Sequence, residues 1–325
     1  MKKNNILEDQ RLEYKSFCEK AGISSAEAFN KRLREGKAEY VVEACEKRHA
    51  QKIKDISFEI KKRDRCRIVC ISGPSSSGKT TFAQRLKHEL EQSGTRAFSI
   101  SIDDYYKFGA DLPIDEDGSP DLESPDAIEA QQLNENLNDL LNGKETVLPV
   151  LDFMAGVKIP SGKTLKINPK DVLIVEGIHA LNPKVVQPNT EFEKYSIYCT
   201  PLNEVLGNDG KRIGSQLTRK LRRLIRDYYY RNASYELTFS TWAKVEKGGE
   251  KNIYPLTENA DNIFNSALAY EYAAYAGHLE AIFKNITEED TYWENAQELF
   301  SEVRQFDRIA EDFIPENSII REFIK

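Results

Sequence analysis

A glycine-rich turn between a short apolar run and a helical pattern constrains the fold of this chain more than any other feature. Residues 67–72 read Arg-Ile-Val-Cys-Ile-Ser, which suits a buried strand, and residues 73–80 read Gly-Pro-Ser-Ser-Ser-Gly-Lys-Thr. Residues 80–92 then predict a helix that Gly94 closes. A strand, the string G-x-x-x-x-G-K-T and a helix, in this order, define a P-loop, the phosphate-binding turn of many nucleotide-binding proteins.

The residue types in this turn match the chemistry of a phosphate site. Glycines let backbone N–H groups point inward around a phosphate, and the start of the helix adds its positive dipole. Lys79 supplies a cation for the β- and γ-phosphates, and Thr80 supplies a hydroxyl for Mg²⁺. We therefore expect the nucleotide site to contain Gly73, Ser75, Ser76, Ser77, Gly78, Lys79, Thr80 and Thr81. A chance match of a serine- and glycine-rich loop is the alternative, and the strand and helix around the string argue against it.

The chain beyond the turn alternates predicted strands and helices, which indicates an α/β fold with a mostly parallel sheet. A hairpin follows the second helix, with turns expected at Gly156 and at residues 160–162. The predicted strands are residues 96–102, 171–176 and 195–199, the predicted helices are residues 126–141 and 214–231, and the hairpin covers residues 149–167.

Helical patterns occupy the first 65 residues. Ser24–Glu27 fits a capping box, and residues 39–62 form an amphipathic stretch that packs on its own domain or serves as a partner-binding arm. We divide the chain into a helical N-terminal extension (1–65), a P-loop domain (66–275) and a C-terminal helical extension that packs on that domain (276–325).

Composition and charge exclude several classes of protein. A length of 325 residues predicts roughly two domains, or one large domain with attachments. The chain is 40% hydrophobic and 30% charged, which supplies enough apolar side chain for a sizeable core. The net charge of −7 argues against a protein dedicated to nucleic acid. No apolar run approaches the roughly 18 residues that span a bilayer, and the N-terminus does not read as a signal peptide. The five cysteines lack C-x-x-C spacing and read as reduced thiols, so we expect a cytoplasmic protein.

Acidic residues follow two of the predicted strands, at the edge where open α/β sheets bind ligands. At Asp103 and Asp104 a carboxylate can take the proton of an acceptor hydroxyl or hold Mg²⁺ through water, although a solvated turn is the alternative. Glu176 ends an apolar strand, where a charge is hard to explain by packing, so we expect it to position metal or water. His179 nearby is either a structural residue or a catalyst.

Four arginines share one face of the predicted helix 214–231, since Arg219, Arg222, Arg223 and Arg226 are spaced i, i+3, i+4 and i+7. In a net acidic protein such a stripe suits a lid over a triphosphate, where guanidinium groups neutralise charge in the transition state. Two alternatives stay open. One is a solvated or salt-bridged helix face, and the other is RNA binding, which 53 acidic against 46 basic residues disfavour.

Taken together, these strings resemble the uridine kinase/phosphoribulokinase family of P-loop kinases over about residues 67–273. The strings are Gly73–Thr80, Ser101–Tyr106, Ser124–Ala127, Pro149–Phe153, Val175–Gly177 and Arg222–Asp227. Residues 259–268 and 318–324 are similar to a longer bacterial uridine kinase-like type, whose N-terminal ubiquitin-like domain we expect to be lacking here. The resemblance implies a three-layer P-loop kinase fold with a β-hairpin insertion and helical N- and C-terminal extensions.

The resemblance also implies roles for individual residues. Asp103 would take the proton from a nucleoside 5′-hydroxyl, Tyr106 would line the nucleoside pocket, and Asp126 would hold the ribose 2′- and 3′-hydroxyls. Arg223, with Arg219 and Arg226 nearby, would be part of the lid that grips the phosphates.

This chain departs from the family pattern where animal-type relatives read the base. The pyrimidine-contacting tyrosine and histidine of those enzymes are Leu151 and Gly156 here, and the arginine after the lid helix is Ala233. The phosphate-binding residues are therefore intact, whereas the base-reading residues are not.

The sequence thus predicts an ATP- and Mg²⁺-dependent kinase that phosphorylates the 5′-hydroxyl of a nucleoside, uridine or cytidine first. Asp103 would be the base, Lys79 and Arg223 would act on the phosphates, and Thr80 and Glu176 would hold the metal. The expected partners are ATP and the nucleoside, without nucleic acid or membrane, and a homo-oligomer is left open. Two alternatives remain: a kinase of the same family with another sugar-like acceptor, and a nucleotide-binding regulator without efficient turnover. A GTPase is disfavoured because no N-K-x-D string is present.

Overall fold

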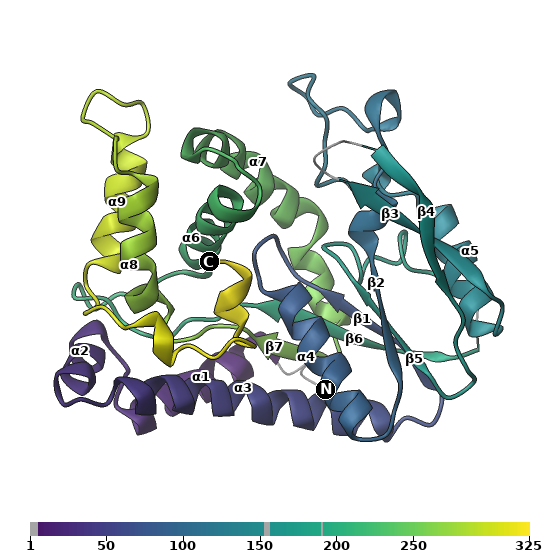
Figure 1. Cartoon of the computed structure of the whole chain (residues 1–325), viewed down its shortest axis with the longest axis horizontal. Helices are drawn as coiled ribbons and strands as arrows, with labels where there is room; N and C mark the ends of the chain where they lie inside the picture. Colours follow the sequence, from purple (N-terminus) through teal and green to yellow (C-terminus); the bar gives the residue numbers. More distant parts are fainter. Residues whose placement is uncertain (1–5, 153–156, 190) are drawn as a thin grey trace.

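Five parallel strands form the central sheet of the chain, in the order β2-β5-β1-β6-β7, with helices on both faces (Figure 1). The description rests on a computed structural model and covers residues 6–152, 157–189 and 191–325. The strands are β1 (Cys66–Ser72), β2 (Ala97–Ser101), β5 (Val172–Glu176), β6 (Glu193–Thr200) and β7 (Asn262–Asn265). The predicted α/β P-loop fold with a mostly parallel sheet is confirmed, and β7 is a strand that the sequence did not reveal.

The two most apolar strands lie in the middle of the sheet. Every residue of β1 and β5 is buried, as expected for strands covered by helices on both faces. Side chains alternate between the faces, because Ile68 and Cys70 join one core while Val69 and Ile71 join the other. In the register of the sheet, Glu176 pairs with Ile71 of β1 and with Ser101 of β2. The carboxyl ends of these three strands therefore meet at one edge.

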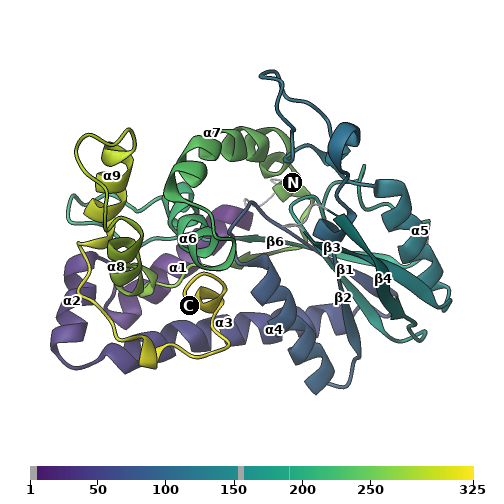
Figure 2. The ribbon, with the colours of Figure 1, turned by 45° about the horizontal axis from the view of Figure 1, so that its top comes forward.

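Helices complete the layers on either side of the sheet. The helices α3 (Ala38–Lys61) and α4 (Lys79–Gln92) share the core on one face, and α5 (Ala130–Leu141) covers the opposite face. A third core joins N- and C-terminal helices, which gather on the side away from α5 (Figure 2). The remaining helices are α1 (Ile6–Ala21), α2 (Ala26–Arg34), α6 (Ser215–Tyr230), α7 (Tyr235–Asn252), α8 (Glu271–Ile282) and α9 (Trp293–Val303).

The antiparallel hairpin is confirmed, but its predicted turn at residues 160–162 is wrong. Strands β3 (Thr146–Asp152) and β4 (Val157–Leu165) pair, and residues 160–162 lie inside β4. The register shifts there, between the pairs Leu148–Lys163 and Val150–Ile159, so proline and glycine mark a strand irregularity rather than a turn. The other predicted turn residue, Gly156, lies outside the described residues.

Two predicted helix starts are also displaced. The N-cap of α2 is Ser25, whose hydroxyl accepts the Ala28 N–H at 3.1 Å, and not Ser24. Residues 125–127 form a 3₁₀ turn, so Asp126 precedes α5 instead of opening it. In both places a serine caps the turn, and sequence alone does not show which of several polar residues does so.

The extensions on either side of the P-loop domain are helical, as predicted. The division at residues 65 and 275 itself stays a prediction, and residues 275 and 276 are consecutive residues of α8. All five cysteines are free thiols and buried. Among the described residues, no helix combines the length and apolarity that crossing a bilayer requires.

Candidate active site

The P-loop is clamped between β6 and the C-terminal segment of the chain. Gly73 has a φ of +154°, and a Cβ there would lie 2.0 Å from the Cys199 carbonyl oxygen. Gly78 caps α4 with a φ of +87°, and a Cβ there would lie 2.7 Å from Cγ2 of Ile319. A side chain at either position would strain the backbone and clash, which explains both glycines of the motif.

Polar groups of the P-loop face its own concavity or the helix α6. The Lys79 ammonium is buried and donates to the Pro74 carbonyl at 3.1 Å. At the apex, Ser75 accepts bonds from two guanidinium groups: Nε of Arg219 donates to its carbonyl and a terminal nitrogen of Arg223 to its hydroxyl, both at 2.9 Å. Ser76 and Ser77 have buried hydroxyls with no hydrogen-bond partner among the described residues. These hydroxyls, together with the start of α4, suit an incoming phosphate.

The arginine face of α6 is turned toward the P-loop, and one of its members is a structural residue. Arg222 and Glu271 are both about 1% exposed and form an ion pair at 2.7 Å. Arg222 also donates to the carbonyls of Ser77 at 3.3 Å and Ser266 at 2.8 Å. Burial alone would lower the pKa of Arg222, but Glu271 beside it holds that pKa above its ordinary value. Arg222 therefore supports the loop from below instead of facing the triphosphate.

The other arginines of the predicted lid also have partners. Arg219 is buried against Glu246 at 3.0 Å, and Arg226 pairs with Asp227 at 2.7 Å while lining the pocket beside the P-loop. Arg223 pairs with Asp227 at 3.4 Å in addition to its bond to Ser75.

Two of the predicted acids lie together at the edge of the sheet. Glu176 is buried and accepts a hydrogen bond from the Ser101 hydroxyl at 2.9 Å. Burial, and then the charge of Asp103, raise the pKa of Glu176. Asp104 lines a small cavity together with Thr80 and Glu176, and its carboxylate accepts the backbone N–H of Leu151 at 3.0 Å, which ties the turn to β3. Asp103 is the member of the acidic pair whose charge acts on Glu176.

A third acid, Glu123, joins this site although the sequence did not single it out. One of its carboxylate oxygens is buried without a hydrogen-bond partner among the described residues. Burial raises the pKa of Glu123 to about 7, against the pull of Arg223, Arg219 and Lys79. Tyr106 is buried next to Asp103 and Glu123 and donates to the Leu122 carbonyl at 3.0 Å.

The structure places Asp126 apart from these acids. Asp126 is exposed on its 3₁₀ turn, on the rim of a hollow that also contains Lys107 and Lys184. His179 packs against the backbone of Glu123 and Ser124, and burial lowers its pKa to about 4. A histidine that stays neutral in this way supports the 123–124 turn and has little to offer as a proton donor near neutral pH.

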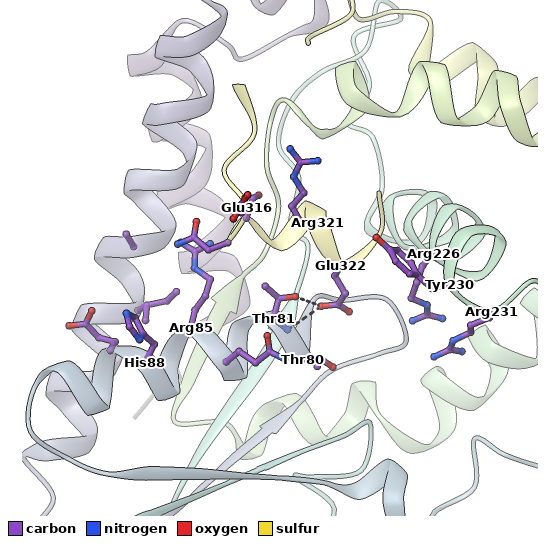
Figure 3. Close-up of a pocket in the computed structure, with 16 residues that line it drawn as sticks. Thr80, Thr81, Arg85, His88, Arg226, Tyr230, Arg231, Glu316, Arg321 and Glu322 are labelled. Atoms are coloured by element: carbon purple, nitrogen blue, oxygen red, sulfur yellow. Dashed lines mark hydrogen bonds between the residues drawn. The ribbon is translucent and has the colours of Figure 1, made fainter. Parts of the chain in front are cut away.

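A pocket of about 800 Å³ adjoins the P-loop on the side of Thr80 and Thr81. Figure 3 shows Arg85 and His88 of α4, Arg226 of α6 and Glu322 of the C-terminal segment around it. The pocket continues from the first turn of α4, so it can take the part of a nucleotide that extends beyond the phosphates.

The residues present fit a magnesium ion. Thr80 is exposed at the start of α4, and the buried Glu176 lies near Asp103, with the charge of Lys79 acting on Glu176 as well. No three His, Cys, Asp or Glu side chains cluster as a metal site in the part of the chain that the structure describes. Thr80 and Glu176 line one cavity, and proteins commonly hold Mg²⁺ through one or two carboxylates together with substrate phosphates.

Comparison with known proteins gives matches in sequence and in structure. A sequence model of the Phosphoribulokinase / Uridine kinase family matches residues 68–271. A uridine kinase of Ureaplasma urealyticum is 29% identical over 195 residues, which cover 60% of this chain and 85% of that protein. A uridine kinase of Staphylococcus aureus is 32% identical over 197 residues, 60% of this chain and 86% of that protein. A solved structure described as a "possible uridine kinase" from Bacillus stearothermophilus is 17% identical, with a TM-score of 0.44 over 67% of this chain and 98% of that one.

Proposed function

Because the chain belongs to the phosphoribulokinase / uridine kinase family and is a phosphotransferase, we propose that it transfers the γ-phosphoryl group of ATP to the 5′-hydroxyl of a nucleoside. The observation that carries the proposal is the neighbourhood of Asp103 and Glu176 at the same sheet edge as the P-loop lysine. A carboxylate beside a phosphate site is what proton removal from an acceptor hydroxyl requires.

In the proposed mechanism, positioning and charge neutralisation supply most of the rate. Lys79 and the first N–H groups of α4 hold the phosphates, and Arg223, kept at the loop by its bond to Ser75, stabilises the charge that develops during transfer. Asp103 takes the proton of the acceptor hydroxyl. Thr80 and Glu176 would hold Mg²⁺, which supplies positive charge to the phosphate oxygens when bound.

The acceptor nucleoside would pack on Tyr106, and a carboxylate would accept hydrogen bonds from its ribose hydroxyls. The family resemblance assigns that carboxylate to Asp126, whereas the buried position of Glu123 beside Arg223 supports Glu123. For the base, Leu151 can pack but cannot form a side-chain hydrogen bond. An apolar pocket discriminates only about 10- to 200-fold, so we propose weak selection between uridine and cytidine, and acceptance of other bases. The adenosine part of the donor would enter the pocket beside Thr81, where Arg226 lies.

The direct test is ADP release with purified protein, ATP and Mg²⁺, screened over uridine, cytidine, adenosine, guanosine and simple sugars. We expect turnover that depends on an added nucleoside. Preference for a sugar would favour the alternative acceptor, and the lack of turnover with any acceptor would favour a regulator. Lys79→Ala should abolish turnover, while Lys87→Ala, on the exposed side of the same helix, should leave it near the wild-type rate.

A further inference from the structure

The C-terminal segment reaches the P-loop from outside the part of the chain that the family model matches. Its last 3₁₀ turn, η6 (Ile319–Glu322), lies beside α4 (Figure 1). Four apolar side chains at most 1% exposed anchor this segment: Ile319, Ile320, Phe323 and Ile324. The Ser318 hydroxyl lies 2.9 Å from that of Tyr270, and the Tyr230 hydroxyl donates to the Ile324 carbonyl at 2.6 Å. The backbone around Glu322 is therefore fixed.

The side chain of Glu322, which is partly exposed, takes both polar donors of Thr81. Its Oε2 accepts the Thr81 backbone N–H at 3.1 Å and the Thr81 hydroxyl at 2.8 Å, as the dashed lines in Figure 3 mark. Thr81 lies in the first turn of α4, whose N–H groups have no partner within the helix. At a P-loop these are the groups that bond phosphate oxygens, so an anion of the protein itself already occupies one phosphate-binding position.

Arg321 and Arg226, which line the same pocket as Glu322, have other partners. Arg321 donates to the carbonyls of Glu311 at 3.0 Å and Ile314 at 2.9 Å, and Arg226 pairs with Asp227 at 2.7 Å. A bound phosphate at Thr81 would therefore meet the negative charge of Glu322 as well as the loss of its two hydrogen bonds.

We propose that Glu322 sets the affinity for the phosphate donor, because its carboxylate holds the Thr81 donors until a donor phosphate displaces it. The inference rests on the proposed function only in taking the P-loop and its pocket as the nucleotide site. Displacement requires rotation of one partly exposed side chain and not departure of the buried segment. In the unliganded protein Glu322 thus stays bonded to Thr81. The more stable this contact is, the lower the apparent affinity for ATP.

The test compares Glu322→Gln and Glu322→Ala with Asp312→Asn, which removes an exposed carboxylate from the same C-terminal region. Calorimetric titrations of the full chain would use inorganic tripolyphosphate, ATP and adenosine, each with Mg²⁺ and without an acceptor. We expect both Glu322 variants to bind tripolyphosphate and ATP about tenfold more tightly, with adenosine affinity unchanged and Asp312→Asn like the wild type. Thermal unfolding of each variant establishes that it is folded.

Unchanged or weaker tripolyphosphate binding in folded Glu322 variants would overturn the proposal, since a residue that merely orients Thr81 would lose affinity when replaced. No binding of ATP or tripolyphosphate to the wild type or to either variant would overturn it together with the nucleotide site. Because no acceptor is present, a wrong acceptor assignment leaves these outcomes intact.

Discussion

Asp103 and Asp104 are consecutive residues of one 3₁₀ turn with different contacts. Asp103 acts electrostatically on Glu176, whereas Asp104 accepts the Leu151 N–H at 3.0 Å. We expect Asp103→Asn to preserve ATP affinity and to lower kcat about 100-fold, the scale of a removed general base. Asp104→Asn should change kcat only a few-fold, since the amide oxygen can still accept that bond. Steady-state kinetics on both variants check this, and reversed severities would transfer the role of base to Asp104.

Glu123 and Asp126 are the two candidates for the carboxylate that holds the ribose hydroxyls, and they differ in burial. Glu123→Gln should raise the KM for a ribonucleoside about tenfold or more and narrow the preference for ribo- over 2′-deoxyribonucleosides, because a buried carboxylate that accepts hydroxyls is lost. Asp126→Asn should do less, since Asp126 is exposed. Kinetics with uridine and 2′-deoxyuridine measure both effects, and a larger effect at Asp126 would restore the role that the resemblance implies.

The raised pKa of Glu123 gives an independent physical signature of the same residue. A carboxyl group with a folded-state pKa of about 7, against 4.5 ordinarily, destabilises the fold progressively as pH rises from about 4.5 to 7. Glu123→Gln should therefore stabilise the protein by about 1–3 kcal/mol at pH 8 and have little effect at pH 4.5. Denaturant unfolding at the two pH values checks this. An equal change at both would mean that Glu123 is ionised as easily in the folded chain as in the unfolded one.

Sequence patterns predict residues whose role is encoded locally and miss those that distant segments bring together. The P-loop string predicted Lys79 and Thr80, and the end of a strand pointed to Asp103. Nothing local distinguishes Glu123 from the other acids of its loop. Its burial depends on close packing against Gly248 of α7, where an added Cβ would lie 2.2 Å from the Glu123 Cβ. Glu322 lies 241 residues from Thr81, so only the folded chain shows their contact.

At the scale of elements, Arg222 of α6 contacts both α8 and the P-loop. Arg222 donates hydrogen bonds to the Glu271 carboxylate and to the Ser77 carbonyl of the P-loop. This one side chain therefore connects α6, α8 and the loop. Arg222→Met should leave Glu271 buried without a partner and destabilise the protein by about 3–5 kcal/mol. The control Arg34→Met breaks an exposed pair with Asp307 and should cost under about 1 kcal/mol. Denaturant midpoints measure both, and equal costs would show that Arg222 adds no support.

Strands, like single residues, are predictable where their own sequence determines them and not where distant segments do. The apolar runs of β1 and β5 were predicted because a strand buried on both faces has little freedom in composition. The four residues of β7, Asn-Ile-Phe-Asn, are too short and too polar to stand out, and the register with β6 alone makes them a strand. The turn predicted at residues 160–162 is wrong for the same reason. Proline and glycine are typical of turns, but pairing with β3 on both sides of these residues keeps them within β4.

At the scale of the whole molecule, α3 and the C-terminal segment both pack on α4, the first helix after the P-loop. Glu46 of α3 accepts bonds from Arg85 of α4 at 3.1 Å and from Tyr270 at 2.7 Å. The Tyr270 hydroxyl in turn contacts Ser318 of the C-terminal segment at 2.9 Å. Side chains from α3, β1, α4 and residues 319 and 323 share one core. Both terminal segments therefore pack against the P-loop domain and are not independent attachments.

This interdependence gives a prediction for two phenylalanines of the C-terminal segment. Phe323 is 0% exposed and packs in the core beneath α4, with Arg222 5.1 Å above its ring, whereas Phe313 is 41% exposed. Phe323→Ala should destabilise the protein by about 3–5 kcal/mol, since truncating a buried aromatic side chain leaves a cavity, and Phe313→Ala by under about 1 kcal/mol. Saturating ATP should raise the Tm of both variants, but Phe323→Ala should bind ATP more weakly because its cavity adjoins the support of the P-loop. Thermal unfolding with and without ATP measures both quantities. Equal stability losses, or unchanged ATP affinity in Phe323→Ala, would mean that the C-terminal segment packs on the nucleotide site without supporting it.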